Sequence, residues 1–264
     1  MSKKPINSVY EQAWLEINRN KKKWILWIIF LFLFSFLFVG LNAGVIFLPL
    51  VFFIGSLLIF MKRVREKFWR QFAEKKRWNY IGEKDVSDEK ALMLNEGHNT
   101  VITNLIEGGM TGRGFRMFEF KFTVGHGKHK RDYHYTAFGF KFKGRFPHLY
   151  LNSFSNGYNV FGKGTHIDLG FPFESKFRLY SPEEYEIEAL QVFTPDVLEY
   201  LLDEDWPYDV ELVGQELLIF RYGLINSVDD LEARFEQAVG LVRHLDSVLD
   251  NMNFSYIEGQ PYFL

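Results

Sequence analysis

The stretch "RMFEFKFTVGHGKHKRDYHYTAFGFKF", residues 116–142, decides the fold of the larger part of this chain. Within residues 116–124, Phe118, Phe120, Phe122 and Val124 alternate strictly with polar side chains, which is the pattern of a half-buried β-strand. Residues 131–142 alternate again, and the segment 125–130 between them carries two glycines, which are typical of a turn. The stretch predicts an antiparallel hairpin, with Tyr133 and Tyr135 opposite the phenylalanine face of the first strand.

The rest of the C-terminal part reads as short strands and helices. Further strands are predicted at 99–108, 148–154, 177–181, 209–214 and 216–223, the last two joined by a tight turn. Helices are predicted at 182–191, 195–203 and 228–251, where Ser227 and Asp230 form an N-terminal capping pattern. The fold class is therefore α+β, an antiparallel sheet with helices covering one face.

Three histidines of the hairpin, His126, His129 and His134, are the candidates for a metal site, because imidazole triads bind zinc. The alternative is that they are solvated turn residues, since their spacing matches no zinc-binding motif. Phosphate binding is disfavoured because Gly-His-Gly-Lys-His leads into a strand and lacks the Ser or Thr of a P-loop. We find no nucleophile, dinucleotide or metalloprotease motif, and we predict neither catalytic residues nor a cofactor.

The N-terminal part contains 38 consecutive uncharged residues, 24–61. A helix of that length would measure about 57 Å at ~1.5 Å per residue, roughly twice the ~30 Å hydrocarbon core of a bilayer. Residues 40–44 contain two glycines and an asparagine that suit a turn, so the run predicts a two-helix transmembrane hairpin. A secretory signal peptide and a transport core are the alternatives, and the length of the run and its lack of ionisable residues disfavour them.

Basic residues flank the apolar run on both sides, and we predict that they contact lipid headgroups: Lys21, Lys22, Lys23, Lys62, Arg63 and Arg65. By the positive-inside rule, both ends of the hairpin would face the cytoplasm. The sequence thus predicts a multi-pass protein of the bacterial inner (plasma) membrane, with both termini and the soluble domain cytoplasmic.

Charge is distributed unevenly along the chain. Residues 1–77 carry 14 Lys/Arg and 4 Asp/Glu, and subtraction from the totals of 31 and 33 leaves 17 and 29 for residues 78–264. The C-terminal part is therefore acidic, which excludes a typical nucleic-acid binder. The absence of cysteine excludes disulfides and a cysteine nucleophile, and suits a reducing compartment.

These observations divide the chain into four segments. Residues 1–23 form an amphipathic juxtamembrane segment, which either lies in the headgroup layer or packs on the main domain. Residues 24–61 form the transmembrane hairpin, residues 62–77 a basic juxtamembrane helix, and residues 78–264 the cytoplasmic α+β domain.

A resemblance is carried by residues 177–196, "FRLYSPEEYEIEALQVFTPD", together with the hairpin and "FPHLYLNSF" at 146–154. The pattern F-x-L-Y-x-P-x-x-Y-E-x-x-A-L-x-x-F-T-P-D resembles a group of uncharacterised bacterial membrane-anchored proteins. That group has N-terminal transmembrane segments before a cytoplasmic α+β domain and no assigned activity. The resemblance implies placement at a membrane and no chemistry.

The leading functional hypothesis is a non-enzymatic module that binds a protein partner or acts as a scaffold at the membrane, with the lipid bilayer as a second partner. One alternative is a metal-dependent membrane-bound hydrolase that uses the hairpin histidines. A third hypothesis is a sensor of anionic lipids that uses the basic flanks.

Overall fold

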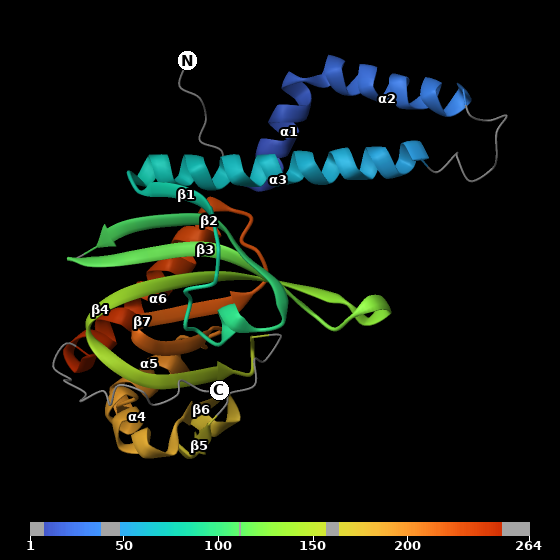
Figure 1. Cartoon of the computed structure of the whole chain (residues 1–264). Helices are drawn as coiled ribbons and strands as arrows, with labels where there is room; N and C mark the ends of the chain where they lie inside the picture. The colour runs from blue at the N-terminus through green and yellow to red at the C-terminus, as the bar shows by residue number, and fades with distance from the viewer. Residues whose placement is uncertain (1–7, 38–47, 111, 157–163, 250–264) are drawn as a thin grey trace. The chain divides into compact units, whose positions relative to one another are not determined.

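The computed structural model describes residues 8–37, 48–110, 112–156 and 164–249. The chain divides into two compact units (Figure 1). The helical unit comprises Met1–Lys75 with Asn226–Asp230, and the sheet unit comprises Lys76–Ile225 with Leu231–Leu264.

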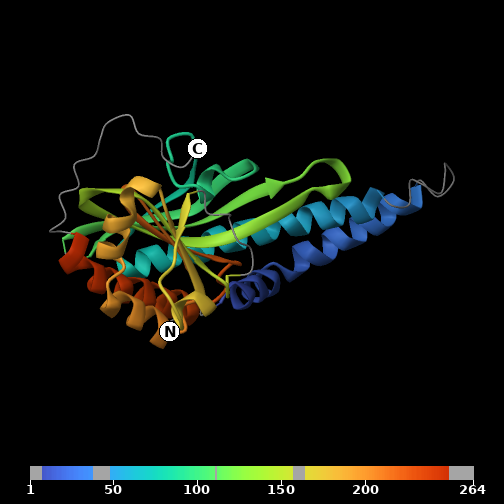
Figure 2. The same cartoon turned by 90° about the horizontal axis from the view of Figure 1, so that it is seen from below.

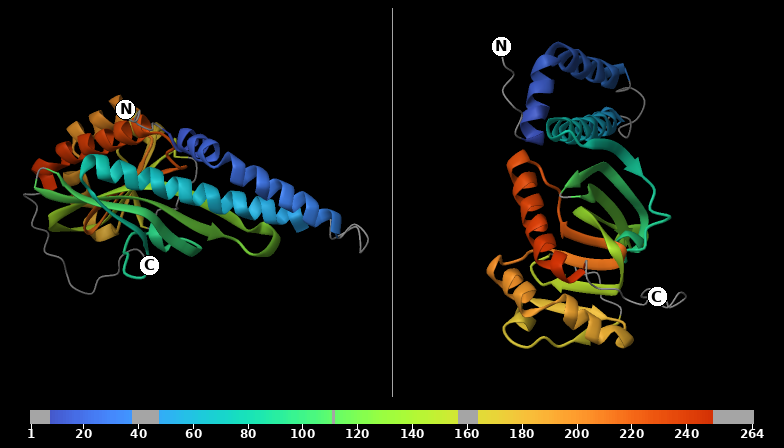
Figure 3. Two further views of the ribbon diagram at one scale, coloured as in Figure 1. Left: turned by 90° about the horizontal axis from the view of Figure 1, so that it is seen from above. Right: turned by 90° about the vertical axis from the view of Figure 1, so that its left-hand side faces the viewer.

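Three helices build the helical unit: α1 (Val9–Arg19), α2 (Lys21–Leu37) and α3 (Leu48–Lys76). The hydroxyl of Ser8 accepts a hydrogen bond from the Glu11 amide at 3.1 Å and so caps the start of α1. Within this unit, the Val9 amide donates to the Asn226 carbonyl at 2.8 Å. Figures 2 and 3 show α2 and α3 running side by side.

The predicted transmembrane hairpin at 24–61 is wrong, because no helix within the described residues is long and apolar enough to cross a membrane. Among the described residues, α2 contains 14 residues of the uncharged run (24–37) and α3 contains another 14 (48–61). The predicted turn at 40–44 lies outside the described residues.

The same finding contradicts the predicted location, a multi-pass protein of the bacterial inner membrane with cytoplasmic termini. Among the described residues, the uncharged run lies in two helices, in α2 as far as Leu37 and in α3 from Leu48. In the structure, α3 instead continues through the bases that follow Met61 and ends at Lys76. The basic helix predicted at 62–77 is therefore the second half of α3.

The sheet unit confirms the α+β class with an antiparallel sheet. Seven strands form it: β1 (Asn79–Lys84), β2 (His98–Met110), β3 (Arg113–Val124), β4 (Arg131–Ser153), β5 (Thr165–Ile167), β6 (Phe177–Ser181) and β7 (Asp209–Tyr222). The strand order is β1-β2-β3-β4-β6-β5, and β7 pairs with β4 outside this path. All recorded pairings within the sheet are antiparallel.

The long strand β4 organises the sheet. Its first half lies between β3 and β7, and its second half pairs with β6 and again with β7. The strands predicted at 131–142 and 148–154 are therefore one strand, which bends where its register with β7 shifts near Phe146. The tight turn predicted between 209–214 and 216–223 is also wrong, because β7 is continuous and Gly214 only interrupts its regular pairing, with φ +62°.

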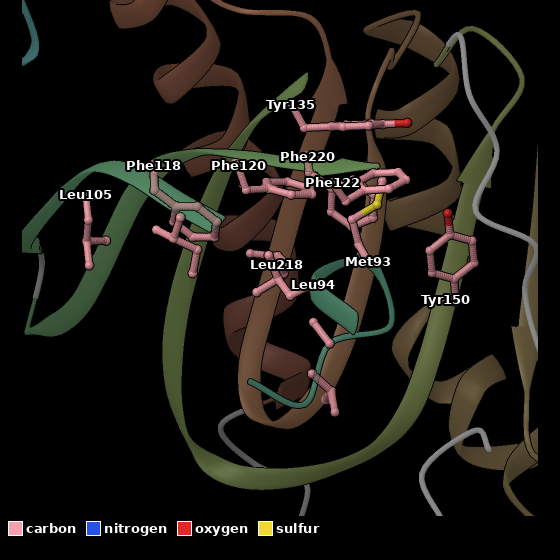
Figure 4. Close-up of a cluster of buried hydrophobic side chains, with 14 residues drawn as sticks. Met93, Leu94, Leu105, Phe118, Phe120, Phe122, Tyr135, Tyr150, Leu218 and Phe220 are labelled. Carbon is pink, nitrogen blue, oxygen red and sulfur yellow. The ribbon is translucent and has the colours of Figure 1, made fainter. Parts of the chain in front are cut away.

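The predicted hairpin is confirmed, since β3 and β4 are joined by the short 3₁₀ helix η3 (Gly127–His129) and Phe120 pairs with Tyr135 and Phe122 with Tyr133. The two rings of Phe120 and Tyr135 stack with centroids 5.2 Å apart. Figure 4 shows this aromatic ladder from β3, β4 and β7, covered by Met93 and Leu94 of η2 (Met93–Asn95). One face of the sheet is thus closed by a short 3₁₀ segment.

Helices cover the opposite face. The helix α6 (Val228–Leu249) lies along the sheet (Figure 3), and its Phe235 packs against Phe138 and Phe140 of β4. The Asp230 amide donates to the Ser227 hydroxyl at 3.1 Å, as the capping pattern predicts. The helix α5 (Pro195–Asp203) has the predicted bounds and contacts α6 through Tyr200.

The remaining elements lie at the end of the sheet formed by β5 and β6 (Figure 1). They are η4 (Phe173–Ser175), η5 (Glu183–Tyr185) and α4 (Glu186–Val192). The helix predicted at 182–191 therefore begins as a 3₁₀ turn and continues as α4.

Candidate binding cavity in the helical unit

A cavity of about 620 Å³ lies between the α1–α2 segment and α3, with all of its lining residues in the helical unit. Four bases line it: Arg19, Lys23, Arg63 and Lys67. Four apolar residues form another part of the wall: Trp24, Trp27, Phe60 and Val64. The lining is completed by Glu16, Asn20 and Ser56. The cavity is therefore amphipathic, with a cationic part and an aromatic part.

Asn20 lies at the junction of α1 and α2, which together form one wall of the cavity. The residue ends α1 with a backbone outside the helical region (φ −109°, ψ 17°), and α2 starts directly after it at Lys21. Both its amide and its side-chain nitrogen donate to the Glu16 carbonyl, at 3.1 Å each. Because the chain changes direction here, the end of α1 and the start of α2 contribute to the same wall.

Helical spacing places the lining side chains of α3 on one side of that helix. Arg63 and Lys67 of α3 are four residues apart, as are Phe60 and Val64, so both pairs share one side of the helix. Across the cavity, the rings of Trp24 and Phe60 meet edge to face with centroids 5.1 Å apart. This aromatic contact connects α2 directly to α3.

Glu16 is the single acid among the lining residues, and two of the bases bind it. Arg19 contacts one carboxylate oxygen at 2.7 Å, and the ammonium of Lys67 contacts the other. The hydrogen bond from Lys67 lowers the pKa of Glu16, which keeps this carboxylate charged. No ion pair is recorded for Lys23 or Arg63 within the described residues, so the lining carries a net formal charge of +3, four bases against one acid.

The structure separates the six bases that we predicted to contact lipid headgroups. Lys23 and Arg63 line the cavity, whereas Lys21, Lys22 and Lys62 are exposed and do not. Arg65 donates instead to the Asn226 side chain at 2.8 Å. The sequence prediction missed Glu16, Arg19 and Lys67. For the two bases a signal was present in the sequence, because Arg19 precedes Lys23 by four residues and Lys67 follows Arg63 by four.

The three candidate metal ligands do not form a site. Within the described part of the chain, no group of three or more His, Asp or Glu side chains is arranged to hold a metal ion. His126 stacks on His98 with ring centroids 5.0 Å apart, and His129 ends the exposed 3₁₀ turn η3. His134 is exposed on β4 and pairs with Lys121 in the strand register.

Polar clusters in the sheet unit that were not predicted include a partly buried one around Arg116 and a buried one around Asp209. In the first, the guanidinium of Arg116 makes four hydrogen bonds of 2.6 Å, two to Glu89 and two to Glu216. Burial and the nearby Glu89 raise the pKa of Glu216, whereas in Glu89 the bonds from Arg116 and Lys84 outweigh burial and lower the pKa. Gly139 pairs with Arg116 in the register, and a Cβ there would lie 2.5 Å from Glu216, so the glycine leaves room for this ion pair.

The second cluster surrounds Asp209 of β7, which is fully buried. Its carboxylate accepts hydrogen bonds from the Tyr150 hydroxyl at 2.9 Å, the Ser153 amide at 2.8 Å and the Asn152 side chain at 3.2 Å. Burial raises the pKa of Asp209 to about 7 in spite of these donors. Because the group has no exposed surface, we assign it to the fold and not to catalysis.

Comparison with known proteins shows the fold alone. No family model matches the chain, and no curated protein sequence matches it. Among solved structures, the chain is similar to the crystal structure of the mycobacterial trehalose monomycolate transport factor A, TtfA. The TM-score is 0.50 at 12% sequence identity, over 70% of this chain and 93% of that one. The resemblance carried by residues 177–196 therefore stays a prediction.

Proposed function

We propose that this chain is a non-enzymatic binding module that associates with a partner protein through α2 and α3. One observation carries the proposal: α2 exposes large apolar side chains on all sides of its segment 25–30, and α3 exposes large apolar side chains within its segment 50–59. Leu26 is 65% exposed and Leu58 is 66% exposed, and six consecutive residues of α2, 25–30, are exposed large hydrophobics. Six consecutive residues span more than one turn of a helix, so no polar face remains.

An apolar surface of this kind is characteristic of an interface. Helices that are hydrophobic on all sides are normally buried, and extended exposed apolar patches on proteins mark sites of association. The partner that matches this surface is a protein with an apolar helical face of its own. Large side chains such as Trp27 and Phe30, whose rings stack with centroids 5.6 Å apart, would supply the anchors of the interface.

The fold comparison adds only a similar fold. The similar structure is named the mycobacterial trehalose monomycolate transport factor A, TtfA. At 12% identity we carry over neither its cargo nor its partners. The hydrolase alternative receives no support, since the described histidines do not converge on a metal site.

The test is co-purification of the tagged full-length chain from the cells that produce it. We expect a stoichiometric protein companion with the unmodified chain and loss of that companion with the double variant Leu26→Asp and Leu58→Asp. The matched control is Phe171→Asp with Ile187→Asp, which alters two exposed apolar residues of the sheet unit and should retain the companion. A companion retained by the helix variant, or none with the unmodified chain, would contradict the proposal.

A further inference from the structure

We propose that the cavity of the helical unit binds a single anionic amphiphile, that is, a carboxylate or phosphate attached to an alkyl chain. The inference goes beyond the proposed association with a protein and does not depend on it. It rests on the charges, the aromatic wall and the size of the cavity.

The charges define the head of the ligand. Arg19 and Lys67 are held by Glu16, so the lining acid is already neutralised. Lys23 and Arg63 then face the cavity with no ion pair recorded among the described residues. An ammonium and a guanidinium together suit an oxyanion, because arginine binds carboxylate and phosphate oxygens in a bidentate manner and lysine adds a second positive charge.

The aromatic wall defines the tail. Trp24, Trp27, Phe60 and Val64 form the apolar part of the lining, and an inorganic anion would leave this surface in contact with water. Trp27 also stacks on Phe30, whose ring is exposed on α2. An alkyl chain can therefore lie against the aromatic side chains that line the cavity, Trp24, Trp27 and Phe60.

The geometry of the rings disfavours a nucleotide. Trp24 and Phe60 are nearly perpendicular, with an interplanar angle of 84°, so they do not form two parallel walls that would hold a base. A volume of about 620 Å³ lies within the usual range of small-molecule sites, about 300–1,000 Å³. It is large enough for a head group and the first part of a chain.

The experiment is calorimetric titration of the purified full-length chain with decyl phosphate and decanoate below their critical micelle concentrations. Three further probes separate the possible sources of binding: inorganic phosphate tests the head alone, decyl maltoside tests the tail alone, and adenosine monophosphate tests a nucleotide. We expect one site for each anionic amphiphile and affinities at least about tenfold lower for the three other probes, since each lacks one half of the interaction.

Variants locate the site. The double variant Lys23→Gln with Arg63→Gln should weaken the binding of decyl phosphate by about tenfold or more. The matched control, Lys21→Gln with Lys22→Gln, removes the same charge from exposed positions that do not line the cavity and should leave the affinity unchanged. The variant Lys23→Arg with Arg63→Lys keeps both charges, and it should still bind if the glutamine variant fails through loss of charge and not through misfolding.

Two results would overturn the inference. Decyl maltoside or adenosine monophosphate binding as tightly as decyl phosphate would show that the anionic amphiphile is not the preferred class. An equal loss of affinity in the cavity variant and in the Lys21/Lys22 control would show that a diffuse positive charge, and not the cavity, attracts the ligand.

Discussion

Asp209 of β7 and Tyr150 of β4 form a hydrogen bond of 2.9 Å between two fully buried side chains, in which the phenol donates to the carboxylate. Burial raises the pKa of Asp209 to about 7, and burial beside Asp209 also raises the pKa of Tyr150. Asp209 is thus one of the groups in the sheet unit whose titration links folding to pH.

Asp209 should make the stability of the sheet unit fall as pH rises. The pKa of Asp209 in the folded protein is about 7, which exceeds the ordinary value of 3.8. Its contribution to the free energy of unfolding is therefore fully present below pH 3.8 and is lost as pH rises through 7. In Asp209→Asn this decline should disappear between pH 4 and 7, as measured by urea unfolding at a series of pH values. The exposed control Asp203→Asn should retain the decline in stability with pH. An unchanged decline in Asp209→Asn would mean that another group causes this pH dependence.

The Arg116 cluster should be sensitive to loss of its cation. Arg116→Met leaves Glu89 and Glu216 facing each other without the guanidinium, and we expect a loss of about 3–5 kcal/mol in the free energy of unfolding. Arg131→Met, at an exposed position of β4, should cost less than about 0.5 kcal/mol. Adding Glu216→Gln to Arg116→Met should restore part of the stability, and no restoration would mean that the loss is not electrostatic.

Gly97 should tolerate alanine less well than Gly127. Both residues have a positive φ, +64° and +57°, so alanine should cost about 1 kcal/mol or more at either position. At Gly97 a Cβ would also lie 2.3 Å from the Thr123 carbonyl oxygen, whereas at Gly127 it would meet nothing within 4 Å. Thermal unfolding should therefore show a larger decrease in melting temperature for Gly97→Ala, and equal decreases would show that the clash is relieved.

The contact between Trp24 and Phe60 should couple α2 to α3. In a double-mutant cycle with leucine at both positions, we expect a coupling energy of about 0.5–1.5 kcal/mol, the usual range for an aromatic pair. Unfolding of the full-length chain followed by circular dichroism measures it. The pair Trp27 and Phe30 lies within one helix and serves as the comparison. Strictly additive losses at Trp24 and Phe60 would mean that the two helices are not held together there.

The sequence was most informative where local periodicity determines structure. The alternation in residues 116–142 predicted the hairpin and its register, and Pro195 with Asp196 predicted the start of α5. It failed where a break depends on tertiary pairing. Gly214 resembles a turn residue, but both sides of it pair with the same long strand β4, so the chain continues through the glycine as one strand.

The candidate cavity could be predicted only in part. Lys23 and Arg63 were recognised as bases beside the apolar run, and their helical neighbours Arg19 and Lys67 follow the same spacing. The junction at Asn20 was not predicted, although an asparagine side chain can hydrogen-bond to the nearby backbone and so compete with the helix. The buried clusters around Arg116 and Asp209 were also missed, since they join residues of different strands.

Site-specific photo-crosslinking in living cells tests the central claim most directly. A photoreactive amino acid is placed at Leu26, at Leu58 or, as a control, at Ile187 of the sheet unit, which is 70% exposed. We predict that the first two positions crosslink to one and the same protein and that Ile187 does not. The absence of any protein adduct at Leu26 and Leu58, or an equal adduct at Ile187, would contradict a partner interface on α2 and α3.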